Sequence, residues 1–227
     1  MIGPPPYPRT PHLWPPAGST GRLVVPREDV PEWLSEPVVV EEKLDGANVS
    51  LWLDPATGRV EVASRGGAGA QDRAGQLGRL RAWVADRQEA LTGLLADGWV
   101  LYGEWLWLEH GIRYDRLPDW LIALDLWHAD RGFAPLDKRD IRCREAGLAR
   151  PPRLFQGAVR DEGRLRQLLA GSALSSDRPA EGLVLRRADG RRCKLVAAGH
   201  VRRSDAEWAQ ARRHNALRAE VSSTKER

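Results

Sequence analysis

The chain has 227 residues, of which 42% are hydrophobic and 29% charged, a balance typical of one globular domain or of one domain with a small appendage. It contains no apolar run long enough to span a bilayer and no signal-peptide pattern, which argues against a membrane protein and favours a cytoplasmic location. The net charge of +4 is compatible with a phosphate-rich partner, and two cysteines without a CxxC pair argue against a zinc site or a disulfide framework.

Hydrophobic periodicity and turn residues predict the elements in chain order. Residues 1–35 are rich in proline and glycine and are expected to form an arm packed on the main domain, residues 36–200. The predicted strands cover 38–43, 47–53, 59–64, 99–107, 120–127, 181–187 and 191–197. The predicted helices cover 76–96, 137–147, 161–170 and 204–220. The last helix belongs to a basic C-terminal segment, 201–227. Hairpins outnumber regular βαβ units, so the predicted class is α+β.

Lysine is scarce in this chain. Of the 35 Lys and Arg residues, only Lys43, Lys138, Lys194 and Lys225 are lysine. Arginine stays protonated and cannot act as an amine nucleophile. A lysine in such a sequence is therefore a candidate for chemistry that needs an amine.

Lys43 ends an apolar strand and is followed by an Asp45-Gly46 turn. A lysine near other cations can lose its proton and attack phosphorus. Taken alone, the string fits a surface lysine before a hairpin turn more often than a nucleophile. Arg192 and Lys194, two apart on a predicted strand, are expected to face the same side, where they could bind phosphate.

Six segments, in the order in which they occur, favour a nucleophilic role for Lys43 over a surface lysine. They are Glu42-Lys43-Leu44-Asp45-Gly46, Ser64-Arg65-Gly66, Gly103-Glu104-Trp105, Leu124-Asp125-Leu126, Glu181-Gly182-Leu183-Val184 and Arg192-Cys193-Lys194-Leu195. Together they resemble the signature motifs of the covalent nucleotidyltransferases, which include polynucleotide ligases and mRNA capping enzymes. Asn48, five residues after Lys43, is similar to the pattern of phage-type RNA ligases that seal nicks in duplex RNA. The arm around Tyr7 and the residues Trp208 and Asn215 are similar to small bacterial relatives of those ligases.

The resemblance implies an α+β adenylation domain of antiparallel sheets with flanking helices and ATP in the groove between them. Lys43 would be the catalytic residue that forms lysyl-AMP. Glu104 and Glu181 would assist the lysine and a Mg²⁺ or Mn²⁺ ion, and Asp45 and Asp125 would support the pocket. The implied nucleotide-binding set is Glu42, Leu44, Asn48, Arg65, Glu104, Leu124, Glu181, Arg192 and Lys194. Two positions depart from the family pattern, because Arg192 replaces a lysine and Leu124 replaces an aromatic residue.

The implied reaction joins a 3′-hydroxyl to a 5′-phosphate on RNA, nicked or duplex, through an adenylylated 5′ end. The chain after Lys194 is short for an OB-fold domain, so none is expected, and a separate RNA-binding or end-processing partner would fit. A basic surface from Arg186 to Arg213 is expected to hold the RNA backbone. The alternatives are a DNA ligase, a capping-type enzyme or a non-catalytic nucleic-acid-binding protein.

Overall fold

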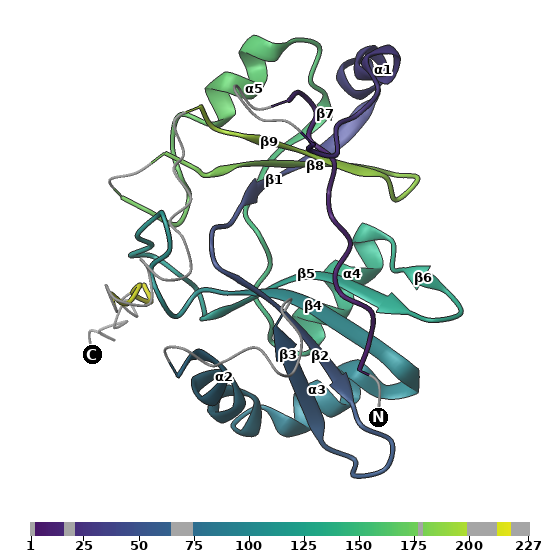
Figure 1. Cartoon of the computed structure of the whole chain (residues 1–227), viewed down its shortest axis with the longest axis vertical. Helices are drawn as coiled ribbons and strands as arrows, with labels where there is room; N and C mark the ends of the chain where they lie inside the picture. The colour runs from purple at the N-terminus through teal and green to yellow at the C-terminus, as the bar shows by residue number, and fades with distance from the viewer. Residues whose placement is uncertain (1–2, 16–20, 65–74, 177–178, 199–212, 219–227) are drawn as a thin grey trace, which may run out of the picture.

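The computed structural model describes residues 3–15, 21–64, 75–176, 179–198 and 213–218. Two antiparallel sheets lie one above the other with helices on their outer faces (Figure 1), which confirms the predicted α+β class. The strands are β1 (Pro37–Lys43), β2 (Ala47–Leu53), β3 (Val60–Ser64), β4 (Trp99–Trp105), β5 (Leu121–His128), β6 (Gly132–Phe133), β7 (Arg153–Ala158), β8 (Gly182–Arg187) and β9 (Arg192–Val196). The four-stranded sheet has the order β7-β1-β8-β9, and the five-stranded sheet has the order β3-β2-β4-β5-β6.

The helices of the described residues are short. They are α1 (Val30–Ser35), α2 (Gln76–Ala85), α3 (Gln88–Leu95), α4 (Leu136–Glu145) and α5 (Glu162–Leu168), with 3₁₀ turns at Arg27–Asp29 and Ala96–Gly98. Within these ranges no helix is both long and apolar enough to cross a membrane.

Each sheet buries one face against its own helices. On the five-stranded sheet, alternate residues such as Leu51 and Leu101 pack against Leu80 of α2 and Leu91 of α3 in one core cluster. On the four-stranded sheet, Val40, Leu185 and Cys193 pack with Trp33 of α1 and Leu165 of α5 in a second core cluster. The opposite faces of the two sheets are turned toward each other (Figure 1). We call the side chains between them the inter-sheet layer.

The link between β1 and β2 carries the chain from one sheet to the other. Leu44 in this link is buried in a third cluster with Leu106 and Tyr114. A Cβ atom at Gly46 would lie 2.6 Å from both the Leu106 side chain and the Trp105 carbonyl oxygen. Only glycine therefore lets the chain turn so close to β4 immediately after Lys43.

The N-terminal arm joins both sheets instead of packing on one surface. His12 forms a parallel bridge to Lys194 at the edge of β9, while the Tyr102 hydroxyl of β4 donates to the Pro5 carbonyl oxygen at 2.7 Å. In Figure 1 the arm, drawn in dark purple, runs from the lower sheet to the upper one. The predicted arm also contains α1, which periodicity did not reveal.

Two predicted helices differ from the structure. The helix predicted over 76–96 is interrupted at Asp86 and Arg87, where the Arg87 guanidinium stacks on Trp83 and pairs with Asp119 at 3.3 Å. The helix predicted over 204–220 is wrong for residues 213–218, which make isolated bridges to Leu108 and Leu117; its remainder, with Trp208, lies outside the described residues. Strands β6 and β7 were not predicted.

Candidate active site

Lys43 is the last residue of β1 and lies opposite Gly182 at the start of β8. Its Nζ atom is 2.7 Å from each carboxylate oxygen of Glu181 and 3.3 Å from the Leu44 carbonyl oxygen. The two side chains are 23% and 9% exposed, respectively. The ammonium group is thus held in one position but remains accessible to a ligand.

Glu104 faces this pair from β4 of the other sheet. One Glu104 oxygen accepts a hydrogen bond from the Gly46 N–H at 3.0 Å, and Asn48 lies directly opposite on β2. Burial raises the pKa of Glu104 to about 7, while the Lys43 ammonium acts in the opposite direction and Glu181 adds to the rise. A carboxyl group with such a pKa changes its charge near neutral pH.

The charge state of Lys43 follows from its carboxylate neighbours. Burial lowers the pKa of Lys43, but Glu181 and then Glu104 outweigh burial and leave that pKa above its usual value. Lys43 is therefore an ammonium ion in the ligand-free protein. Lys43 becomes a neutral, nucleophilic amine only when another cation pairs with these carboxylates in its place, or when further cationic charge lies nearby.

The turn after Lys43 is fixed by Asp45. Its Oδ2 atom accepts from the Gly111 N–H at 2.6 Å, and its own N–H donates to the Tyr114 hydroxyl at 2.9 Å. The Tyr114 N–H in turn donates to the Asn215 side chain at 2.8 Å. Because β1 ends at Lys43, Asp45 does not continue the strand and anchors a loop instead.

A second charged cluster in the inter-sheet layer surrounds Asp125. Arg186 and Arg192 contact its two oxygens at 2.8 and 3.2 Å, and the Tyr7 hydroxyl donates to it from the arm. Arg192 also lies over the rings of Tyr7 and Phe133, 4.5 and 4.6 Å from their centroids. Asp125 therefore links both sheets and the arm.

Glu41 continues this cluster toward Lys43. It accepts from Arg186 Nε at 2.6 Å and from Arg139 Nη2 of α4, also at 2.6 Å. The Arg139 and Glu41 side chains are almost fully buried. Strand alternation puts Glu41 on the same face of β1 as Lys43, so the sequence pattern could have identified Glu41 as a neighbour of the site. No local sequence pattern indicates the same for Arg139.

Several predicted site residues lie elsewhere. Glu42 points to the opposite face of β1, where its carboxylate accepts from Ser172 and from the Ala173 N–H, and burial raises its pKa. Leu44 is a core residue. Neither side chain is brought to Lys43 in this structure.

Leu124 and Arg65 also belong to the predicted nucleotide-binding set. Leu124 occupies a bulge in β5 opposite Tyr102 and Gly103, and its carbonyl oxygen accepts from Arg139 at 2.8 Å and from Arg186 at 3.2 Å. Its role toward a base remains a prediction. Arg65 lies outside the described residues.

The predicted basic surface is largely neutralised in the β8–β9 hairpin. Arg187 and Arg191 pair with Glu32 and Asp189, and Arg186 is only 10% exposed within its ion pairs. These arginines are bound to carboxylates, so an RNA backbone would have to compete for them. The basic residues between 199 and 212 lie outside the described residues.

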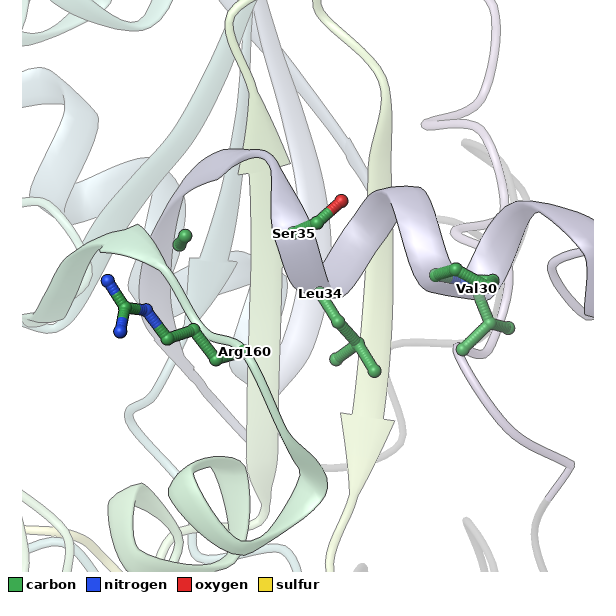
Figure 2. A pocket seen from close by; sticks show the side chains of 6 residues that line it. Val30, Leu34, Ser35 and Arg160 are labelled. Atoms are coloured by element: carbon green, nitrogen blue, oxygen red, sulfur yellow. The ribbon is translucent and has the colours of Figure 1, made fainter.

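A hollow on the molecular surface lies away from these groups. Figure 2 shows it beside α1, with Val30, Leu34 and Ser35 on one side and Arg160 on the other. None of the residues that line it belongs to the clusters around Lys43 or Asp125. In the described ranges, no group of three or more histidine, cysteine, aspartate or glutamate side chains forms a ready-made metal site.

Comparison with solved structures identifies the fold. A Naegleria gruberi RNA ligase solved with PPi matches with a TM-score of 0.56 at 17% identity, covering 75% of this chain and 52% of that one. An archaeal ATP-dependent RNA ligase matches with a TM-score of 0.53 at 20% identity, covering 73% of this chain and 44% of that one. The chain thus spans about half the length of these ligases.

Sequence comparison gives the family. No curated protein matches the chain. The family model described as RNA ligase, however, matches residues 36–203, which include both charged clusters and most of the chain. The chain belongs to the RNA ligase family.

Proposed function

We propose that this chain is an ATP-dependent RNA ligase domain that works through a lysyl-AMP intermediate on Lys43. The observation that carries the proposal is the position of Lys43: an accessible amine held between the sheets by Glu181 at 2.7 Å, with Glu104 facing it. It lies inside the region that matches the RNA ligase family. Membership alone leaves the reaction open, and this amine supplies the nucleophile.

In the first step, the Lys43 Nζ lone pair forms a bond to the α-phosphorus of ATP. The bond from that phosphorus to the bridging oxygen of pyrophosphate breaks, and pyrophosphate leaves. The Lys43 ammonium group releases two protons to solvent over this step, one before attack and one after it, so the phosphoramidate nitrogen is neutral and keeps one hydrogen. Displacement at phosphorus depends on positioning and on neutralising the phosphate charge.

The carboxylates around Lys43 suit a divalent ion that arrives with ATP. Glu104 and Glu181 offer oxygen ligands, which Mg²⁺ and Mn²⁺ accept, and a nucleotide-bound ion takes its other ligands from phosphates and water. Such an ion would neutralise phosphate charge. Once Glu181 no longer holds the ammonium, the influence that raises the Lys43 pKa is removed, and the amine becomes easier to deprotonate.

The remaining steps use RNA ends. An oxygen of an RNA 5′-phosphate attacks the phosphorus of lysyl-AMP, and Lys43 leaves. A 3′-hydroxyl then attacks the 5′-phosphorus, and AMP departs as the new phosphodiester forms. Nicked duplex RNA is the proposed substrate, with a separate RNA-binding or end-processing partner and a cytoplasmic location.

A labelling experiment tests the proposal. The protein is incubated with Mg²⁺ and ATP labelled on the α-phosphate, and covalent label is measured on the wild type, Lys43→Ala, Lys43→Arg and Lys138→Ala. Lys138 lies exposed on α4 and serves as a matched lysine control. Label on the wild type and Lys138→Ala alone supports the proposal.

Four results would contradict it. An absent adduct on the wild type, or an adduct that survives both Lys43 substitutions, removes the proposed nucleophile. An adduct formed with GTP only would indicate a capping-type enzyme. Sealing of nicked DNA in preference to nicked RNA would indicate a DNA ligase.

A further inference from the structure

His12 is a buried histidine of the arm that the proposed reaction does not use. It is 5% exposed, and its backbone is held on one side by Leu23 and Val25. The His12 N–H donates to the Leu23 carbonyl oxygen and the Val25 N–H donates to the His12 carbonyl oxygen, both at 2.8 Å. The ring is therefore carried on a fixed backbone.

The opposite side of the same segment pairs with β9. The Lys194 N–H donates to Pro11 at 2.9 Å, and the Leu13 N–H donates to Lys194 at 2.8 Å. In a parallel bridge of this kind, the paired residues His12 and Lys194 direct their side chains to the same face of the sheet. Leu13, which points the other way, is fully buried in the outer core with Cys193. His12 thus faces the inter-sheet layer.

Lys43 lies on that same face. Lys194 pairs with Val184, and Val184 pairs with Glu41, two residues before Lys43 on β1. Burial, followed by the charges of Lys194, Arg22 and Lys43, lowers the pKa of His12 to about 4. The imidazole is therefore neutral, and every charged group that shifts it is a cation.

The His12 ring also has an unused polar atom. Within the part of the chain that the structure describes, the buried Nδ1 atom has no hydrogen-bond partner. A buried polar atom without a partner is costly, and native proteins rarely contain one without a ligand, water or ion to satisfy it. The cations around the ring favour an anion.

We propose that His12, together with Lys194, binds a phosphate oxygen of the substrate that reacts at Lys43. This inference rests on the proposed ligase function only for the identity of the phosphate. The chemistry itself is a neutral imidazole N–H donated to an anionic oxygen beside a lysine. Two sources are compatible with it: the polyphosphate tail of ATP and the 5′-phosphate of the RNA.

The first test is direct binding without catalysis. Binding of inorganic pyrophosphate and of inorganic phosphate is measured by calorimetry for the wild type, His12→Leu and His12→Asn, with His128→Leu as the control. His128 is a β5 histidine whose ring is already bound to the Asp97 carbonyl oxygen at 2.8 Å. His12→Leu is expected to weaken binding about tenfold, the effect of losing one hydrogen bond to a charged group. Asparagine can place a donor near the Nδ1 position, so His12→Asn is expected to retain most of the affinity.

Thermal stability separates this role from a structural one. Leucine replaces an unsatisfied polar atom with an apolar group, so His12→Leu should be at least as stable as the wild type without ligand. It should lose only the stabilisation that pyrophosphate confers on the wild type. A His12→Leu protein that binds both anions like the wild type, or that loses stability without losing affinity, would overturn the proposal.

The source of the phosphate is read from the separate steps. If His12→Leu slows lysyl-AMP formation and raises the KM for ATP, the ligand is the polyphosphate. If lysyl-AMP forms normally but AMP transfer to RNA slows, the ligand is the 5′-phosphate. If the wild type forms no adduct, the ligase function fails, while loss of pyrophosphate binding in His12→Leu would still establish a phosphate site.

Discussion

Asp125 on the five-stranded sheet and Arg186 on the four-stranded sheet form an ion pair across the inter-sheet layer, with Nη1 and Oδ1 2.8 Å apart. The same carboxylate also holds Arg192 and the Tyr7 hydroxyl. The two arginine side chains are each about one-tenth exposed. A single carboxylate thus contacts two buried cations, of which Arg186 is also paired with Glu41, and connects three segments of the chain.

Removing that carboxylate should destabilise the fold. Asp125→Ala leaves Arg186 and Arg192 buried with less compensating charge, and loss of one partner of a buried pair typically costs about 3–5 kcal/mol. The free energy of unfolding in urea measures the effect. Glu162→Ala, which removes an exposed pair with Arg166 on α5, is the control and should cost less than about 1 kcal/mol. Equal losses of unfolding free energy in both variants would show that the Asp125 cluster stabilises the fold no more than an exposed ion pair does.

The charge on Lys43 should depend on Glu181. Glu181→Gln removes the carboxylate that keeps the Lys43 pKa above its usual value, so that pKa should fall while burial continues to lower it. NMR titration of labelled lysine side chains can follow this, because the chain has only four lysines. The Lys138 signal should stay unchanged. A Lys43 pKa that is the same in wild type and variant would contradict the role given to this ion pair.

Glu104 should make stability depend on pH. Its pKa is raised from 4.5 to about 7, so between these values the folded protein keeps a proton that the unfolded chain has lost. Stability should therefore fall as pH rises through this window, by on the order of 1–3 kcal/mol for a partly exposed group. Glu104→Gln should remove that part of the decrease between pH 5 and pH 8, as measured by urea unfolding. Glu61→Gln, at an exposed position of β3, should retain it.

Much of the fold follows from local patterns. The apolar run Val38-Val39-Val40 predicted β1, and Asp189-Gly190 predicted the β8–β9 turn, in which Gly190 has a φ of +85°. The interruption after α2 was not predictable, because it depends on Asp119, a residue distant in sequence. Tertiary contacts of this kind override an apolar pattern that would fit one longer helix.

The site was predictable only where ordered motifs existed. They placed Lys43, Glu104 and Glu181 together, as the structure does. The arm residues Tyr7 and His12 act through partners 118 and 182 positions away, and no local periodicity marks such contacts. Glu42 shows that proximity in sequence does not ensure proximity in the site. Adjacent residues of a strand point to opposite faces, so the Glu42 side chain lies on the other face of β1 from Lys43.

Gly182 should be needed for the register that brings Glu181 to Lys43. It lies opposite Lys43 in the β1–β8 ladder, and a Cβ atom there would lie 2.2 Å from the Leu195 carbonyl oxygen. Because that neighbour is backbone, Gly182→Ala must push β9 away from β8, at a cost of about 1–3 kcal/mol.

Gly93 of α3, where a Cβ would meet nothing within 4 Å, is the matched control. Gly93→Ala should stabilise the protein by about 0.5–1 kcal/mol, since glycine weakens a helix interior. If urea unfolding shows the two alanine variants changing stability in the same direction, close packing at Gly182 does not constrain the strand that presents Glu181. If Gly182→Ala is destabilised as expected, its yield of labelled lysyl-AMP at a temperature where it stays folded should also fall, because the displaced strand no longer presents Glu181 beside Nζ, where it would hold the divalent ion that arrives with ATP.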